Sequence, residues 1–372
     1  MGKNILITHI HINTGGIETS LVNMLNMLDK KKYNIDLLLY YPNGELLNLI
    51  PKHINVIPVW NTHKKDNTKL KKLVLSRRLQ DRLLKNLLLN KHTVKKFIPN
   101  KHYDIAIAYS GYFEFTDLIA GMANADKKYI WSHADFFTQC KLDKNFRKKF
   151  QKIYSRYYLF DKIICVSSNA ANNLKNIAKK YADKIDFLWN FNLPRNIDKN
   201  EDFILKGDFK IVTISRLYKY KGIERLIEAC RYINKPFKLY VLGDGPYKEQ
   251  YKLLIKQYNL QDKIILLGNV LNVFNILKQA DLYVSSSDAE GLSNVILESL
   301  MCNTPVISTP TAGAKEIEKY IVPKNAMTLC SDFNAKNLAE KIQNFKLNKD
   351  FTFNIQDVNN KILDKLENNF LN

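Results

Sequence analysis

Short apolar runs alternate with helix-like segments along most of the chain, and this alternation limits the folds open to it. Strands that are apolar throughout and separated by helices are typical of parallel sheets covered on both faces. The alternation stops at a polar stretch, 192–208, and then restarts. Two such series predict an α/β chain with two doubly wound, Rossmann-like domains. The predicted strands are 4–8, 35–40, 105–109, 129–131, 162–166, 185–188, 210–214, 238–242, 264–267, 282–285 and 305–308.

The polar stretch is the natural boundary between the two domains. We predict an N-terminal domain over 1–191 and a C-terminal domain over 192–352. The chain of 372 residues is long enough for two domains of ordinary size. The last segment, 353–372, follows the second series and is helix-like over most of its length. It is expected either to cross back to the N-terminal domain or to be a frayed tail.

The chain is strongly basic, with a net charge of +21. Such a surface attracts anions, among them nucleic acid, an acidic membrane surface and phosphorylated small molecules. About half of the charge lies in one segment, 64–101, whose leucines recur at helical spacing. Such a basic amphipathic segment either lies on anionic lipid headgroups or packs its leucines on the N-terminal domain. The sequence alone leaves both possibilities open.

The cysteines and the apolar runs restrict the cellular setting. The five cysteines lie far apart and form no C-x-x-C pair. This disfavours a disulfide scaffold or a zinc ribbon and fits a reducing compartment. No apolar run approaches the roughly 18 residues that a membrane-spanning helix needs. We therefore expect a cytoplasmic protein that is peripheral at the inner face of the cell membrane.

A short loop with two cations follows the first predicted strand of the second series. Arg216 and Lys221 stand five positions apart, and the next predicted helix begins at Ile223. A guanidinium, an ammonium and the free N–H groups of a helix N-terminus together bind phosphate oxygens well. The loop therefore predicts an anion site, although a basic loop without a ligand would contain the same residues.

Two carboxylates, Glu290 and Glu298, stand eight positions apart further along the chain. Glu290 falls in a loop, whereas Glu298 falls one turn inside a helix that begins near Ser293 or Asn294. The pair can face one ligand from its two ends, with the loop amides between them directed at negative charge. Carboxylates accept hydrogen bonds from hydroxyl groups, which suits a sugar at one end and a ribose at the other. Otherwise, Glu298 only caps a helix or pairs with a lysine.

The order and spacing of these motifs resemble those of the retaining family 4 glycosyltransferases of GT-B fold. The chain also has Gly-Asp-Gly-Pro at 243–246, a Pro-Val-Ile strand start at 305–307, a Gly-Gly loop at 15–16 and a strand-end histidine, His133. The resemblance implies two Rossmann-like domains that face each other across a cleft. The chain departs from the family pattern near the domain boundary, where only Asn190 matches, so the geometry of the hinge is in doubt.

The resemblance implies a role for each residue at a matching position. Arg216 and Lys221 would hold the donor diphosphate, Glu290 the transferred sugar and Glu298 the ribose. His133 would contact the sugar near the reacting carbon, unless it is a structural residue. The other expected donor-binding residues are Gly15, Gly16, Gly243, Gly245, Gly291, Leu292 and Ser293. His9 and His11, just before the Gly-Gly loop, are weaker candidates.

The activity implied by the resemblance is transfer of a sugar, with retention of its anomeric configuration, from a nucleotide-diphosphate sugar. A UDP-sugar is the expected donor, and a glycan or lipid-linked acceptor in cell-surface polysaccharide synthesis, such as capsule or lipopolysaccharide, is the expected acceptor. Neither a cofactor nor a metal is expected, which agrees with the absence of Asp-x-Asp from the sequence. The sequence does not indicate the sugar, the acceptor's identity or the oligomeric state.

Two other functions remain open. A nucleotide-sugar epimerase with the same fold is one, although the two motifs in this order disfavour it. A basic nucleic-acid-binding protein is the other, but the chain lacks an aromatic RNA-binding signature, a helix-turn-helix pattern and zinc-finger spacing.

Overall fold

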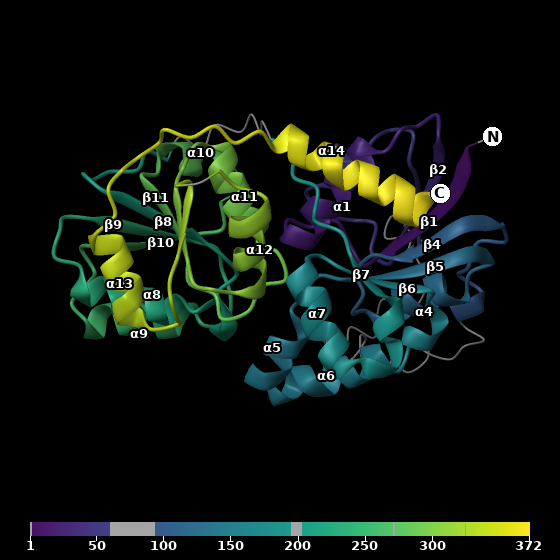
Figure 1. Ribbon diagram of the computed structural model, residues 1–372, viewed down its shortest axis with the longest axis horizontal. Coiled ribbons are helices and arrows are strands. Elements are labelled where there is room, and N and C mark those ends of the chain that lie inside the picture. The colour runs from purple at the N-terminus through teal and green to yellow at the C-terminus, as the bar shows by residue number, and fades with distance from the viewer. Residues whose placement is uncertain (1, 60–93, 195–202, 271, 324) are drawn as a thin grey trace, which may run out of the picture.

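The chain folds into two parallel sheets, each flanked by helices, and the two sheets lie side by side along the longest axis of the molecule (Figure 1). The structure is a computed structural model, which describes residues 2–59, 94–194, 203–270, 272–323 and 325–372. All strand pairs in these residues are parallel, as the uniformly apolar runs predict. The α/β prediction is thus confirmed.

The N-terminal sheet has the strand order β3-β2-β1-β4-β5-β6-β7 within the described residues. From β1 the successive strands are added toward one edge of the sheet, and from β4 toward the other edge. The position between β1 and β4 is therefore a topological switch point, and ligands of such sheets bind there, beyond the carboxyl ends of the strands. The strands are β1 (Lys3–His9), β2 (Tyr33–Leu39), β3 (Asn55–Pro58), β4 (Tyr103–Ala108), β5 (Ala125–Ser132), β6 (Lys162–Cys165) and β7 (Ile185–Phe187). The helices are α1 (Gly16–Met27), α4 (Glu114–Met122), α5 (Phe136–Leu142), α6 (Lys144–Tyr154) and α7 (Ser168–Ile177).

The C-terminal sheet repeats this winding in the order β10-β9-β8-β11-β12-β13, so its switch point lies between β8 and β11. The strands are β8 (Lys210–Ile214), β9 (Lys238–Leu242), β10 (Ile264–Gly268), β11 (Leu282–Ser285), β12 (Val306–Ser308) and β13 (Met327–Leu329). The helices are α8 (Ile223–Ala229), α9 (Lys248–Gln257), α10 (Val273–Gln279), α11 (Asn294–Met301), α12 (Ala312–Tyr320) and α13 (Ala335–Gln343).

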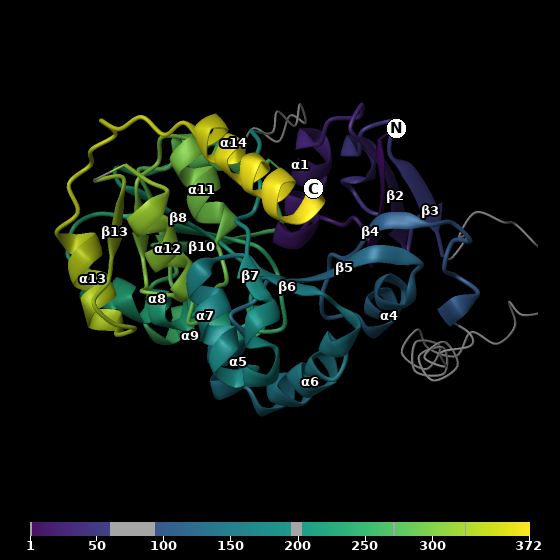
Figure 2. The same cartoon turned by 45° about the vertical axis from the view of Figure 1, so that its right-hand side comes forward.

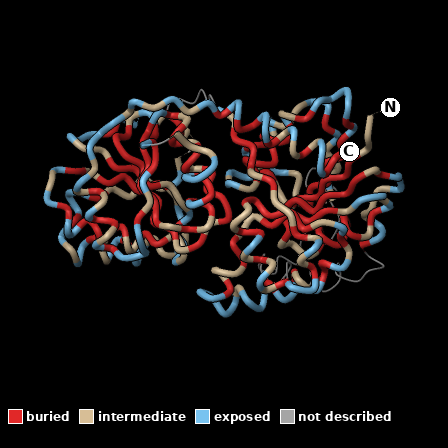
Figure 3. The backbone as a smooth tube through the Cα atoms, viewed as in Figure 1, coloured by how far each residue is buried: buried red, intermediate tan, exposed pale blue. Residues whose placement is uncertain are grey.

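The central strands are buried on both faces (Figure 3). In β1, Ile5 and Ile7 pack into one apolar cluster and Leu6 into another on the opposite face, and none of the three is exposed. This follows from the period of two in side-chain direction along a strand. All five cysteines are also buried, as small apolar side chains commonly are.

The last helix, α14 (Ile355–Leu366), leaves the C-terminal domain and lies against the N-terminal one (Figure 1 and Figure 2). Its Asn359 amide donates to the backbone oxygen of Asn192 at 2.7 Å. Beyond the helix, Glu367 pairs with Lys32 at 2.9 Å, and Phe370 is buried. The end of the chain therefore ties the two domains together rather than fraying.

Two strands, β3 and β13, have no counterpart among the predicted ones. Both are edge strands. The four residues of β3 are partly or fully exposed, and β13 has only three residues. An edge strand has a neighbouring strand on one side only and is less buried than a central strand. Its sequence therefore lacks the continuous apolar run from which a buried strand is predicted. β5 also starts earlier than predicted, because Asp126 and Lys127 near its start are polar and exposed and so interrupt the apolar run.

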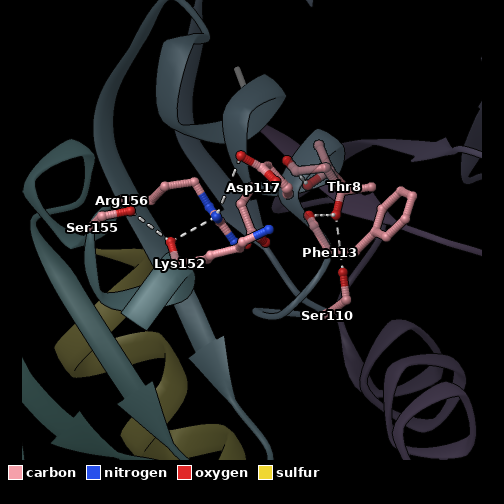
Figure 4. Close-up of polar contacts among 9 residues, drawn as sticks. Thr8, Ser110, Phe113, Asp117, Lys152, Ser155 and Arg156 are labelled. Carbon is pink, nitrogen blue, oxygen red and sulfur yellow. Dashed lines mark hydrogen bonds and ion pairs between the residues drawn. The ribbon is translucent and has the colours of Figure 1, made fainter. Parts of the chain in front are cut away.

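A buried polar cluster holds α4 and the loop before it in place (Figure 4). The Thr8 hydroxyl donates to the backbone oxygen of Thr116 at 2.9 Å, and the Ser110 and Thr116 hydroxyls lie 3.0 Å apart. Asp117, with no exposed side-chain surface, accepts a hydrogen bond from Arg156 at 2.8 Å. Burial raises the pKa of Asp117 to about 6, although Arg156 acts in the opposite direction.

We expect replacement of Asp117 by Asn to change how stability depends on pH. The pKa of Asp117 is about 6 in the folded state and 3.8 ordinarily. Between pH 3.8 and about 6 the folded protein therefore holds a proton on Asp117 that the unfolded chain has lost. The wild type should therefore lose free energy of unfolding relative to D117N as pH rises through about 6, by on the order of 2 kcal/mol. Urea unfolding of both proteins between pH 4.5 and 7.5 measures this difference. The exposed Asp183→Asn variant should show no such trend, and a constant difference for D117N would contradict the raised pKa.

Candidate active site

A cleft of about 710 Å³ opens between the two domains, where the carboxyl ends of strands from both sheets meet. The loops after β1 and β8 border it, so the switch points of both sheets lie at the same place. In open α/β sheets this is where ligands bind. The predicted site residues that line the cleft are Gly15, Gly16, His133, Arg216, Lys221, Gly243, Glu290, Gly291, Leu292, Ser293 and Glu298.

The loop after β8 brings Arg216 and Lys221 to the cleft, as its sequence predicts. The Lys221 ammonium pairs with the carboxylate of Glu290, which lies in the loop after β11. Because β8 and β11 are neighbours in the sheet, residues 69 positions apart meet here. The cation motif and the carboxylate motif therefore form one polar site.

Glu290 is held from two sides. Besides Lys221, the hydroxyl of Ser287 donates to its Oε1 at 2.9 Å, and the backbone oxygen of Glu290 accepts from Gly313 N at 3.1 Å. The side chain keeps 17% of its surface exposed, so it can still reach a ligand. Glu298 lies on the second turn of α11, which begins at Asn294 as predicted, and lines the same cleft.

His133 follows the end of β5 and lines the cleft from the N-terminal side. Its Nε2 lies 2.8 Å from the backbone oxygen of Tyr109, which can only accept, so Nε2 carries the proton. Burial lowers the pKa of His133 to about 4, against the effect of this hydrogen bond. Nδ1 of the neutral ring is then an acceptor, and it has no partner among the described residues.

The Gly-Gly loop opens α1 at the edge of the cleft, and Glu18 folds back beneath it. The Glu18 carboxylate lies 3.5 Å from Nε2 of His9 and 3.8 Å from Nδ1 of His11. Burial acts to raise the pKa of Glu18, but His9, a backbone N–H group and His11 together outweigh it, so the pKa lies below its ordinary value. His9 and His11 are not among the residues that line the cleft; they lie behind the loop.

Gly245 does not lie where the sequence predicts. It is absent from the lining of the cleft. Its Cα packs on the backbone of Leu217, so that a Cβ at this position would come within 2.6 Å of the Leu217 oxygen. The close approach of two loops explains this glycine, whereas Gly243 of the same motif does border the cleft.

Several cleft residues were not predicted from the sequence. Tyr218 and Tyr220 accompany the cations, with the Arg216 guanidinium 5.7 Å from the Tyr218 ring and the Lys221 ammonium 5.4 Å from the Tyr220 ring. Both tyrosines lie between Arg216 and Lys221 in the sequence, and this position could have predicted that they line the cleft. Asn294 donates to the backbone oxygen of Gly16 at 2.8 Å and so links the two domains across the cleft. No local pattern marks that contact.

Other predictions fall partly or wholly outside the described residues. Most of the basic segment 64–101 does so, because residues 60–93 are not described. In the parts of the chain that the structure covers, three or more His, Cys, Asp or Glu side chains nowhere gather in an arrangement suited to a metal ion. None of the helices described is both long enough and apolar enough to span a bilayer.

The C-terminal part of the chain matches a known family. Residues 194–359 match the family described as "Glycosyl transferases group 1". Arg216, Lys221, Glu290 and Glu298 all lie within this range.

Curated relatives match about half of the chain. The N-acetylgalactosamine-N,N'-diacetylbacillosaminyl-diphospho-undecaprenol 4-alpha-N-acetylgalactosaminyltransferase of Campylobacter jejuni is 33% identical over 165 residues, or 43% of this chain and 45% of the relative. An uncharacterized glycosyltransferase of Methanocaldococcus jannaschii is 32% identical over 217 residues, or 57% of this chain and 45% of the relative. The chain thus spans less than half the length of these relatives.

Solved structures resemble the whole chain. HepE from Anabaena, in complex with UDP and glucose, has a TM-score of 0.68 and 17% identity, covering 98% of this chain and 100% of that one. A TarM variant from S. aureus, in complex with fondaparinux, alpha-GlcNAc-glycerol and UDP, has a TM-score of 0.71 and 14% identity, covering 99% and 97%. At this level of identity the likeness establishes the fold, which is GT-B, as predicted.

The His133 ring is expected to stay neutral at every pH at which the protein is assayed. Its pKa of about 4 places protonation well below neutrality, because burial disfavours the imidazolium. Histidine ring signals in NMR spectra recorded between pH 5.5 and 8 measure this, and the H133N variant identifies the signal by its loss. A His133 signal that titrates with a midpoint above 6 would show that the ring is solvated or faces a carboxylate.

Proposed function

We propose that this protein is a retaining glycosyltransferase that moves a sugar from a UDP-sugar to a glycan or lipid-linked acceptor of cell-surface polysaccharide synthesis. The observation that carries the proposal is the meeting of Arg216, Lys221, Glu290, Glu298 and His133 in one cleft between the two domains. Two of these residues are cations and two are carboxylates, which matches the diphosphate and the hydroxyl groups of a nucleotide sugar.

The first chemical demand is charge on the leaving nucleoside diphosphate. Arg216 and Lys221 lie where they can offset that charge as the bond to the sugar breaks. In the structure the Lys221 ammonium pairs with Glu290. Donor binding would replace this contact, with Lys221 turning to the diphosphate and Glu290 to a sugar hydroxyl. We propose that these cations supply the positive charge that a divalent metal supplies in other transferases.

The second demand is orientation of the sugar and of the attacking hydroxyl. His133 borders the cleft from the N-terminal side, beside the place proposed for the sugar, and Glu298 offers a carboxylate to the ribose. A front-face displacement has the acceptor hydroxyl attack from the side of the departing diphosphate, whose oxygen takes up the proton. The anomeric configuration is then retained. Enclosure between two domains holds the reactants and excludes water, which would otherwise hydrolyse the donor.

The nature of donor and acceptor is supported by the similar proteins. The structures of HepE and TarM contain UDP, and the name of the Campylobacter jejuni relative specifies a diphospho-undecaprenol acceptor. A lipid-linked acceptor would bring the enzyme to the inner face of the membrane. The described part of the N-terminal domain carries exposed cations suited to that, including Lys144, Lys148 and Lys152, four positions apart along α6.

Removal of the Glu298 carboxylate is expected to weaken UDP binding by roughly 10- to 100-fold, because a charged hydrogen bond to the ribose is lost. At 100 times its Kd, a nucleotide stabilises the wild type by about 2.7 kcal/mol, and a hundredfold weaker Kd leaves about 0.4 kcal/mol. Thermal shifts of wild type and E298A with UDP, GDP, ADP and CMP, with and without EDTA, measure this. The exposed Glu340→Ala variant on α13 should keep the full shift.

The same experiment separates the proposed function from its alternatives. Loss of the UDP shift on adding EDTA would contradict the metal-free site, and stabilisation by RNA or duplex DNA alone would contradict the transferase. Conversion of a UDP-sugar to its epimer without an acceptor would favour the epimerase. The anomeric configuration of a transferred sugar, read from NMR coupling constants, decides whether the enzyme retains it.

Charge reversal along α6 is expected to weaken binding to anionic membranes. Each lysine near such a surface contributes about 1 kcal/mol, so K144E/K148E/K152E should lower the partition coefficient by at least about 100-fold. Sedimentation with phosphatidylglycerol-containing vesicles at low salt measures it. The variant K252E/K256E/K346E changes the net charge equally on the C-terminal domain and should bind as the wild type does. Equal loss in both variants would show that only the net charge matters.

A further inference from the structure

A buried carboxylate stands at the seam between the two domains, behind the cleft. Glu316 lies on α12 of the C-terminal domain, which faces α7 of the N-terminal domain (Figure 1 and Figure 2). None of its surface is exposed. A buried carboxylate is costly unless hydrogen bonds replace its lost hydration. Its partners therefore indicate which part of the fold it serves.

Within the described residues, the Glu316 carboxylate accepts four hydrogen bonds, and all four come from the N-terminal domain. The backbone N–H and the hydroxyl of Ser168 donate at 3.0 and 2.5 Å, and the backbone N–H of Asn169 donates at 3.3 Å. The indole N–H of Trp189 donates at 2.8 Å. Ser168 and Asn169 open α7, whose unsatisfied N–H groups favour negative charge. A helix of one domain is thus capped by a carboxylate of the other.

The residues beside Glu316 hold the loop that carries Glu290. At the start of α12, Gly313 donates its N–H to the backbone oxygen of Glu290 at 3.1 Å. Just before α7, the Ser167 hydroxyl donates to the backbone oxygen of Gly291 at 2.7 Å, and both atoms are buried. The helices that Glu316 joins, α12 and α7, are thus both hydrogen-bonded at their N-terminal ends to this loop, at the adjacent backbone oxygens of Glu290 and Gly291.

That loop is pressed against the strand end that carries His133. A Cβ on Gly291 would come within 2.7 Å of the His133 backbone oxygen and 2.8 Å of a Val166 methyl group. Only a residue without a side chain allows this approach. The contact between Gly291 and His133 therefore sets how Glu290 of one domain lies relative to His133 of the other. The geometry of this contact depends on how α12 packs against α7.

We propose that Glu316 is a positioning residue, which aligns Glu290 with His133 by capping α7 across the domain seam. Glu316 is not among the residues that line the cleft. It sets the relation between the domains at the cleft, whereas the side chains proposed above to bind the nucleotide, Arg216, Lys221 and Glu298, all belong to the C-terminal domain. The kinetic part of this inference rests on the proposed function, whereas the structural part does not.

The test compares Glu316→Gln with Glu318→Gln, an exposed glutamate on the same helix. Glutamine keeps the size of the side chain, but it replaces one carboxylate oxygen by an NH2 group. That group cannot accept the hydrogen bonds that Ser168, Asn169 and Trp189 donate. We expect the turnover number of E316Q to fall by about 10- to 100-fold, as misalignment of reacting groups does. The donor KM and the Kd for UDP should change less than about threefold. E318Q should match the wild type, and S168A, which removes one of the four bonds, should show a smaller loss of turnover.

Hydrogen–deuterium exchange supplies a readout that does not depend on activity. In E316Q we expect faster exchange at the start of α7 and also in the peptides that contain residues 288–293 and 131–135. Faster exchange at α7 alone would show a local helix cap and overturn the proposal. A fall in UDP affinity as large as the fall in turnover would overturn it as well.

The two hypotheses fail in different ways. If the wild type transfers no sugar to any acceptor, the proposed function fails, and the exchange pattern alone decides the positioning role. If transfer occurs and E316Q turns over as the wild type does, the positioning role is wrong and the proposed function stands.

Discussion

The site depends on a close approach of two backbones, at Gly291 of the C-terminal domain and His133 of the N-terminal one. Parallel sheets present their ligand-binding loops at one edge, so two such sheets create a cleft only when those edges face each other. The contact at Gly291 holds the loop that carries Glu290 against the strand end that carries His133. Ser167 and the Glu316 cap hold that contact from behind.

Buried and half-buried charges concentrate where elements must be held in a particular arrangement. Asp117 and Arg156 hold α4, Glu316 holds α7 against α12, and Lys221 holds the Glu290 side chain. Such groups lose hydration and add little net stability, so positioning is a better reason for their presence than stability. Lys221 differs from the others because it lines the cleft.

The sequence predicted those parts of the fold and of the candidate site that local patterns encode. Continuous apolar runs marked the buried central strands, and the cation and carboxylate motifs marked loops that the structure brings into one cleft. The edge strands β3 and β13 were missed because exposed strands need no apolar run. Gly245 was assigned to the donor because a glycine required by loop packing looks the same in sequence as one required by a ligand.

The sequence by itself determined the α/β class, the two domains and the residue types that can bind a nucleotide sugar, because periodicity and motif spacing are properties of neighbouring positions. Only the tertiary structure decided that Lys221 meets Glu290, that Asn294 reaches Gly16 and that Glu316 caps α7. Each of these contacts joins residues far apart in the chain. Their geometry follows from strand order and domain packing, which no local pattern records.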